Sequence, residues 1–209
     1  MSEPRIHRAF AMPSALTFEM PPVRELLDRW LGGHTRIVDP FCGNSTISLH
    51  RNDIRHRGGM DALDWLRDIR AQGVIASAVL LDPPYSPRQI REHYKAIGRT
   101  INIEDTQNAR LYRLAREGLD ALLEPGGIAI SFGWSSTGFG ERMGYGLREL
   151  LLVHHGGAHN DTIVLVEQKG LTGNAVTNDR SSALCDGQSL LSGGLRIEPP
   201  DAVIKPEAA

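Results

Sequence analysis

The chain has 209 residues, of which 41% are hydrophobic and 23% charged, which is typical of a single water-soluble globular domain and not of a membrane protein. Its formal net charge of −2 argues against a protein that binds polyanions through its overall charge, although charge can still be concentrated locally. Two cysteines, Cys42 and Cys185, are too few for a disulfide framework, and the N-terminal residues lack the apolar core of a secretory signal, so we expect a cytoplasmic protein.

The first half of the chain alternates helical and strand patterns. Apolar residues at helical spacing, with prolines at the start and two glycines at the end, predict a helix over 20–33. The short apolar run 36–39 predicts a strand, and 49–53 predicts a second one. A further helix is predicted over 60–73. The run "ASAVLLD" predicts a buried strand over 76–82, which must end there because two prolines follow.

The second half continues in the same way. A helical pattern spans 108–127, and an apolar strand follows over 127–133. Two further strand patterns, 147–155 and 161–168, are joined by "GGAHN", which is typical of a hairpin connection. The remaining sequence is small, polar and rich in glycine and proline, without periodicity, and it predicts that 171–209 is a disordered tail.

Residues 1–170 form the predicted domain, and the order of their elements indicates an α/β fold. Strands that alternate with helices, followed by a final strand pair, predict a mostly parallel sheet with a C-terminal antiparallel strand pair. In such sheets, ligands bind outside the carboxyl ends of the strands. Five loops are therefore expected at one cleft, namely those after Asp39, after Asp82, at 132–134, at 153–155 and at 160–161.

The loop "DPFCGNST", residues 39–46, directly follows the first predicted strand. Asp39 can accept hydrogen bonds at the end of this strand, and Gly43 lets the backbone approach a ligand closely. The G-x-G-x-x-G fingerprint of dinucleotide-binding proteins is absent, so a nicotinamide cofactor is disfavoured. By itself, the motif is equally well interpreted as a polar turn after a strand.

A second motif, "DPPY", residues 82–85, follows the buried strand. In this order, the two motifs resemble the D-P-F-x-G-x-G-T cofactor loop and the [D/N/S]-P-P-[Y/F/W] catalytic loop of amino-methyltransferases that use S-adenosylmethionine. The D-P-P-Y form is most typical of adenine-N6 enzymes. Together with the runs "EPGGIAISFGW" and "HGGAHNDTIVLVE", the motifs resemble small phage- and prophage-type DNA adenine methyltransferases over residues 10–167.

This resemblance implies a Rossmann-like methyltransferase fold with S-adenosylmethionine as cofactor. The implied partner is double-stranded DNA with one adenine flipped out of the helix. Asp82 and the carbonyl of Pro83 would accept hydrogen bonds from the N6 amine, Pro83 and Pro84 would hold these acceptors rigid, and Tyr85 would stack on the base. Neither a metal nor a membrane is expected. The expected setting is a bacterial or phage-infected cell, with a homodimer or a separate recognition partner as further expectations.

The resemblance also assigns cofactor contacts. Asp53 would meet the ribose and Asp61 the adenine amine of the cofactor, although a solvated surface acid and a helix N-cap are the respective alternatives. Thr17 and Phe18 match an N-terminal segment that packs on the cofactor, and Phe18 is equally well interpreted as a core residue. The expected cofactor-binding residues are Thr17, Phe18, Asp39, Pro40, Phe41, Gly43, Asp53 and Asp61.

DNA contacts are predicted from local charge and from the topology. Segment 86–116 carries seven lysines and arginines against three acidic residues, a net charge of +4, and it begins at the catalytic loop. A solvated helix face is the alternative interpretation. The histidines His154, His155 and His159 complete no zinc ligand set, so no metal site is predicted. The expected DNA-binding residues are Arg88, Arg91, Trp134, His159 and Asn160.

Two departures from the family pattern keep other functions open. Ser45 replaces the second glycine of the cofactor loop, and 46–53 leaves little room for the helix that usually separates the first two strands. A catalytically degenerate cofactor-binding scaffold is therefore one alternative. The others are the same chemistry on another target, namely cytosine N4 or a base in structured RNA. No segment is long enough for a separate target-recognition domain of the usual kind, so recognition is expected to be short and relaxed or to be supplied by a partner.

Overall fold

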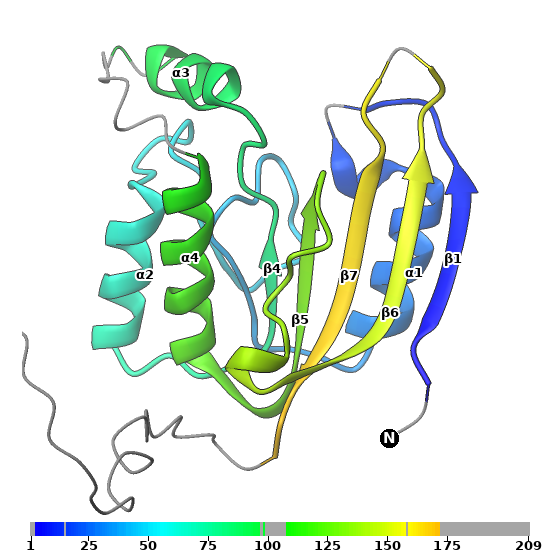
Figure 1. Cartoon of the computed structure of the whole chain (residues 1–209). Coiled ribbons are helices and arrows are strands. Elements are labelled where there is room, and N and C mark those ends of the chain that lie inside the picture. Colours follow the sequence, from blue (N-terminus) through cyan, green and yellow to red (C-terminus); the bar gives the residue numbers. More distant parts are fainter. Residues whose placement is uncertain (1–2, 15, 97, 99–107, 158, 172–209) are drawn as a thin grey trace, which may run out of the picture. The chain divides into compact units, whose positions relative to one another are not determined.

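Seven strands form one sheet in the computed structural model, in the order β1-β6-β7-β5-β4-β2-β3 (Figure 1). The structure describes residues 3–14, 16–96, 98, 108–157 and 159–171, so the predicted tail lies outside the described residues apart from Leu171. Every strand pair is parallel except the two that β7 makes, with β5 and with β6. The strands are β1 (Arg5–Phe10), β2 (Ile37–Asp39), β3 (His50–Arg51), β4 (Ala76–Leu81), β5 (Leu123–Gly133), β6 (Tyr145–His154) and β7 (Thr162–Lys169).

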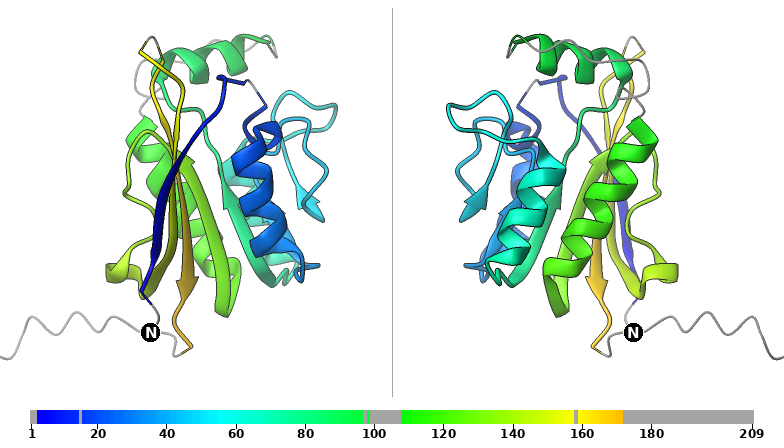
Figure 2. Two further views of the ribbon diagram at one scale, coloured as in Figure 1. Left: turned by 90° about the vertical axis from the view of Figure 1, so that its right-hand side faces the viewer. Right: turned by 90° about the vertical axis from the view of Figure 1, so that its left-hand side faces the viewer.

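Helices cover both faces of this sheet and its carboxyl edge. α1 packs on one face, against Ile130 and Leu151, whereas α2 and α4 pack on the other face, against Val79 (Figure 1). α3 lies across the edge at which the parallel strands end (Figure 2). None of the helices in the described ranges is long and apolar enough to cross a membrane. The helices are α1 (Pro21–Leu31), α2 (Ala62–Ala71), α3 (Pro87–Ala96) and α4 (Asn108–Leu122), with 3-10 turns η1 (Thr17–Glu19) and η3 (Glu141–Met143).

The predicted α/β fold, with a mostly parallel sheet and a final antiparallel strand pair, is confirmed. The periodicity located α1, α2 and α4 because each of these helices buries one apolar face. In α1, for example, Val23, Leu26 and Leu27 are buried at helical spacing. The chain between β2 and β3 contains no helix, as the short segment 46–53 between the first two predicted strands suggested. β3 is an edge strand of only two residues.

Strand β1 is missing from the sequence-based prediction, because "RIHRAF" lacks the apolar alternation of a strand with one buried face. β1 extends the sheet in parallel with β6, and the buried carboxylate of Glu149 on β6 fixes it there. Glu149 Oε1 lies 2.7 Å from His7 Nε2, and its two oxygens accept hydrogen bonds from Arg29 (2.6 Å) and Trp30 (2.8 Å) of α1. Burial alone would raise the pKa of Glu149, but hydrogen bonds from Trp30, His7 and Arg29 lower it. One buried acid thus joins β1, β6 and α1.

Candidate cofactor and catalytic site

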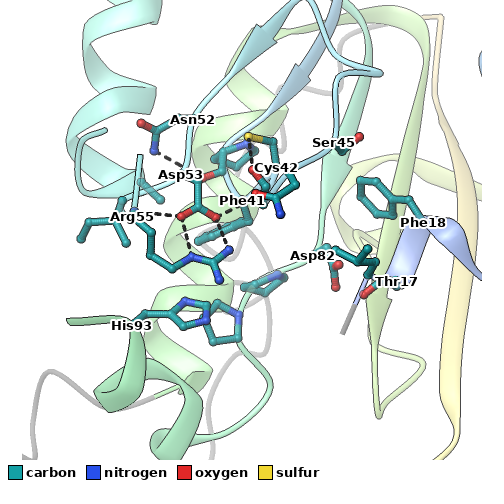
Figure 3. Close-up of a pocket in the computed structure, with 18 of the residues that line it drawn as sticks. Thr17, Phe18, Phe41, Cys42, Ser45, Asn52, Asp53, Arg55, Asp82 and His93 are labelled. Atoms are coloured by element: carbon teal, nitrogen blue, oxygen red, sulfur yellow. Dashed lines mark hydrogen bonds and ion pairs between the residues drawn. The ribbon is translucent and has the colours of Figure 1, made fainter. Parts of the chain in front are cut away.

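A cavity of about 610 Å³ lies at the carboxyl edge, beside the ends of β2, β3 and β4 (Figure 3). η1, α1 and α3 complete its walls. Of the five loops expected at one cleft, only those after Asp39 and Asp82 line it. The prediction was wrong for 153–155 and 160–161, since β6 and β7 lie on the far side of β5 from the cavity. Segment 132–134, at the end of β5, does not line the cavity, but its Trp134 contacts Tyr85 of the loop after β4. The predicted residues among the lining are Thr17, Phe18, Pro40, Phe41, Gly43, Asp53, Asp61, Asp82, Pro83, Pro84 and Tyr85.

Asp39 ends β2 and is fully buried, so this predicted cofactor-binding residue does not itself line the cavity, although Pro40 and Phe41 after it do. Its Oδ1 accepts a hydrogen bond of 3.0 Å from the amide of Phe41, whereas its Oδ2 has no partner among the described residues. Burial raises the pKa of Asp39 to about 8, and the nearby carboxylates of Asp82 and Asp53 add to the rise. An unpaired buried carboxylate oxygen is costly unless a ligand pairs with it, so this atom fits a site for a bound donor or cation.

The loop after β2 and the loop after β3 are tied together by Asp53. Asp53 Oδ2 accepts a hydrogen bond of 3.1 Å from the amide of Gly43, which adopts a left-handed conformation with φ of +53°. Arg55 donates to both carboxylate oxygens at 2.8 Å (Figure 3). Burial opposes ionisation of Asp53, but the hydrogen bonds from Arg55 outweigh it and lower the pKa. A ribose hydroxyl would therefore have to share Asp53 with Arg55, a residue that the sequence analysis missed.

Asn52 is a second residue that the sequence analysis missed. It is buried, and its side chain accepts a hydrogen bond from the amide of Met60 and donates one to the carbonyl of Met60, both at 3.0 Å. Its amide group also lies 3.4 Å from the carbonyl oxygen of Pro40. Asn52 thereby fixes the start and the end of the loop after β3 and joins them to the loop after β2. Asn52 falls inside the predicted strand 49–53, so no local pattern singled it out.

Asp61 caps helix α2. Its Oδ1 accepts a hydrogen bond of 2.9 Å from the amide of Leu63, which is the N-cap role considered above. Its Oδ2 accepts a hydrogen bond from the hydroxyl of Tyr94 on α3. Asp61 therefore joins α3 to α2 while it lines the cavity, and the contact with a cofactor amine stays a prediction.

Asp82 directly follows β4, next to the strand that ends in Asp39. The hydroxyl of Tyr85 donates to Asp82 Oδ1. The hydroxyl of Thr17 also bonds the carboxylate, and Figure 3 shows Thr17 beside Asp82. Burial raises the pKa of Asp82 to about 6, and these two hydrogen bonds moderate the rise. Thr17, expected to contact the cofactor, thus lies beside Asp82, the predicted catalytic carboxylate.

The capping residues of α3 hold the backbone of the catalytic loop. Gln89 Oε1 accepts hydrogen bonds from the amides of Tyr85 (2.7 Å) and Ser86 (3.2 Å), and the hydroxyl of Ser86 accepts one from the amide of Gln89 (3.2 Å). This reciprocal pattern is a capping box, and "SPRQ" is its sequence signal. The sequence analysis missed Gln89. Its hydrogen bonds fix Tyr85 relative to the start of α3.

Trp134 lies next to the catalytic loop although it does not line the cavity. Its ring is 5.6 Å from that of Tyr85, at an interplanar angle of 51°, and the residue is 46% exposed. Glu167 on β7 fixes the loop that follows Trp134. Its carboxylate accepts hydrogen bonds of 2.7 Å from the amides of Phe139 and Gly140 in this loop. Trp134 is therefore placed to extend the aromatic surface of Tyr85 towards solvent.

The other predicted DNA-binding residues lie outside the cavity. Arg88 and Arg91 are exposed on α3, and Arg88 pairs with Glu92 at 2.8 Å. His159 and Asn160 are exposed in the β6–β7 connection. Part of the basic segment 86–116 lies outside the described residues.

Of the three histidines at the β6–β7 connection, His155 has a structural role. His155 is buried, with its ring nitrogens 2.8 Å from the carbonyl oxygen of Ala11 and 2.9 Å from the hydroxyl of Thr162, so it supports the fold. Within the described ranges, no group of three or more His, Cys, Asp or Glu residues is arranged to hold a metal ion.

Comparison with known proteins gives distant likenesses only. No protein-family model and no curated protein matches the sequence. The chain is similar to TrmN from Thermus thermophilus, with 21% identity and a TM-score of 0.43 over 72% of this chain and 49% of TrmN, so it spans about half the length of that protein. It is also similar to the N-methyltransferase NodS from Bradyrhizobium japonicum WM9, solved with S-adenosyl-L-homocysteine, with 10% identity and a TM-score of 0.43 over 71% of this chain and 88% of NodS. At these TM-scores, function has to be argued from the site itself.

Proposed function

We propose that the chain transfers a methyl group from S-adenosylmethionine to the exocyclic N6 of adenine in DNA. One observation supports this most strongly. Two carboxyl groups lie at the ends of neighbouring parallel strands: Asp82, which lines the cavity, and Asp39, which is buried next to the lining residue Pro40 with one oxygen unpaired. A carboxylate near each ligand would stabilise the positive charge of a methyl donor and the charge that develops on an amine acceptor.

The residues of the two loops divide the chemistry between them. When bound, S-adenosylmethionine supplies an activated methyl group on a sulfonium ion. Asp39 would pair with a donor or positive charge of this cofactor, and the Gly43 loop would approach it through its backbone. Asp82 and the carbonyl of Pro83 would accept hydrogen bonds from the N6 amine, which orients the nitrogen lone pair and stabilises the positive charge that develops on it. N6 gains a methyl group and loses a proton, which Asp82 can take up.

The decisive experiment is methyl transfer from tritiated S-adenosylmethionine to an adenine-containing duplex, followed by nucleoside analysis. The expected product is N6-methyladenine. Label on cytosine, or label only on a structured RNA offered in parallel, would replace the proposed substrate by one of the alternatives. Failure to bind S-adenosylmethionine in a calorimetric titration would instead favour the scaffold interpretation, which Ser45 and the Arg55–Asp53 contact make worth testing.

Tyr85→Phe is expected to move the acid limb of the pH–rate profile to higher pH. Asp82 must be ionised to accept the amine, so turnover should fall as pH drops through its pKa of about 6. The hydroxyl of Tyr85 holds this pKa down, and its loss raises the pKa further. Single-turnover rates between about pH 5 and 8 test this.

At pH 8, Tyr85→Phe should keep most of the activity, whereas Tyr85→Ala should also lose stacking energy of about 1–3 kcal/mol. An unmoved limb would contradict the role of the hydroxyl.

Arg88→Ala/Arg91→Ala is expected to raise the Michaelis constant for DNA without affecting cofactor affinity. Both side chains are exposed on α3, directly after the catalytic loop. Loss of two phosphate contacts should flatten the log–log salt dependence of DNA binding by about 1.8. Arg70→Ala/Arg142→Ala, which removes two exposed arginines elsewhere, is the matched control and should leave the slope unchanged. An equal slope in both double variants would remove α3 from the DNA-binding surface.

A further inference from the structure

A second groove of about 530 Å³ lies at the opposite side of the loop after β3, and the proposed function leaves it unused. It shares Asn52, Asp53 and Met60 with the cofactor cavity and extends along the free edge of β3 to α2. Basic side chains dominate its polar lining, with Asp68 as the only carboxylate besides the buried Asp53. The basic members of the lining are His50, Arg51, His56 and Arg57.

The groove keeps an excess of positive charge, since Asp68 offsets only one of its two unpaired arginines. The run "HRNDIRHR", residues 50–57, has three arginines against one aspartate, a net charge of +2 with neutral histidines, in a chain whose net charge is −2. Its one acidic residue, Asp53, forms an ion pair with Arg55. Arg51 and Arg57 are exposed, and neither forms an ion pair with any described residue. Two guanidinium groups therefore face solvent without a partner beside a groove.

The backbone that carries these side chains is held in place. Asn52 closes the loop through its hydrogen bonds with Met60, and Gly58 turns the chain with φ of +81°. A Cβ atom at Gly59 would lie 1.9 Å from the carbonyl oxygen of Asp53, so only glycine allows this close approach. A basic surface on a fixed loop loses less entropy when it binds a ligand than one on a mobile segment.

The loop after β3, which forms one wall of the groove, also contacts the predicted DNA-binding helix. His93 of α3 lies close enough to Arg55 for the charge of that arginine to contribute to lowering the pKa of His93, after burial. Tyr94 of α3 bonds to Asp61, at the end of the same loop. Figure 2 shows the loops after β2 and β3 beside one end of α3 at the carboxyl edge. α3, which carries the exposed Arg88 and Arg91, and the groove therefore adjoin the same loop.

We propose that the groove at the β3 edge, with Arg51 and Arg57, binds the phosphodiester backbone of the nucleic-acid substrate at a second point beside α3. This inference rests on the proposed function, because a flipped base enters the cavity only if the flanking strand is held beside it. Guanidinium groups suit phosphate through charge and hydrogen bonding, and such contacts position a substrate without reading its sequence.

The test compares Arg51→Ala/Arg57→Ala with wild type, with Arg51→Lys/Arg57→Lys and with the control Arg70→Ala/Arg142→Ala. Fluorescence anisotropy measures binding of a labelled adenine-containing 20-mer, single-stranded and as a duplex, over a range of salt concentrations. The alanine pair should flatten the log–log salt slope by about 1.8 for the duplex or about 1.4 for the single strand. The lysine pair should keep the wild-type slope, because a phosphate contact needs a positive charge. Calorimetry with S-adenosylmethionine should give equal affinity for all four proteins.

The outcomes separate this proposal from the proposed function. If the alanine pair keeps the wild-type slope while Arg88→Ala/Arg91→Ala flattens it, the groove is not a phosphate site and the proposed function stands. The groove proposal also fails if a polyglutamate peptide displaces the 20-mer from wild type as well as unlabelled DNA does, since the site would then bind any polyanion. If wild type binds S-adenosylmethionine but neither form of the 20-mer, the proposed substrate and the groove proposal fall together.

Discussion

Asp82→Asn is expected to abolish methyl transfer while the affinity for S-adenosylmethionine stays within a few-fold of wild type. The amide keeps the shape of the side chain but removes the negative charge that would stabilise positive charge on the attacking nitrogen. Removal of one such preorganised group costs on the order of 10²–10³ in kcat. Asp82 is half-buried directly after β4 and is held by Tyr85 and Thr17, so the group is already oriented before substrate binds. Single-turnover kinetics measure the rate, and calorimetry measures the affinity.

Asp64→Asn provides the matched control for this experiment. Asp64 is exposed on α2 and pairs only with Arg67 among the described residues, so its neutralisation should change neither rate nor affinity. An Asp82→Asn variant that keeps more than a tenth of the wild-type rate, a loss below about 1.4 kcal/mol, would overturn the assigned role. Loss of cofactor binding in the same variant would place Asp82 in the cofactor site instead.

The two carboxylates of the site could be predicted from the sequence because both directly follow apolar strands. A parallel sheet brings the carboxyl ends of its strands to one edge, so Asp39 and Asp82 had to lie on the same side of the molecule. The two residues are also neighbours because β2 pairs with β4. This strand order cannot be read from a local sequence pattern. The same limit explains why loops 153–155 and 160–161 were expected at the cleft but lie beyond β5.

The residues missed by the sequence analysis act through contacts that short motifs do not contain. Arg55 matters because a turn brings its side chain back to Asp53, and β1 matters because Glu149, far away in the chain, fixes it. Gln89 differs from these, since the capping-box spacing from Ser86 was visible in the sequence. Local hydrogen-bond signals can therefore be read from the chain, whereas the partners of buried charges depend on how the sheet is assembled.

Asp39→Asn is expected to stabilise the ligand-free protein at neutral pH and to abolish cofactor binding. The pKa of Asp39 is raised from an ordinary value of 3.8 to about 8, because the carboxyl is fully buried with one oxygen unpaired. Between these values, the folded state holds a proton that the unfolded state has released. The stability of the wild type should thus decrease by about 1.4 kcal/mol per pH unit from this group alone, and level off only above the folded pKa.

Asparagine removes this titration, so the advantage of Asp39→Asn over wild type should grow by about 2–3 kcal/mol between pH 5.5 and 7.5, as measured by urea denaturation. Asp64→Asn, which neutralises an exposed acid, should show no such growth.

The same substitution of Asp39 should weaken cofactor binding. Without the carboxylate, the end of β2 no longer offers a negative charge to the cofactor, and affinity for S-adenosylmethionine should fall at least tenfold. Wild type should also release a proton on binding at pH 7, when a cation makes Asp39 ionise, and calorimetry in buffers of different ionisation enthalpy detects this. A pH-independent stability difference together with unchanged cofactor affinity would show that Asp39 is an ordinary structural acid. The expected pair of results would show instead that the buried Asp39 destabilises the ligand-free fold and that cofactor binding offsets this destabilisation.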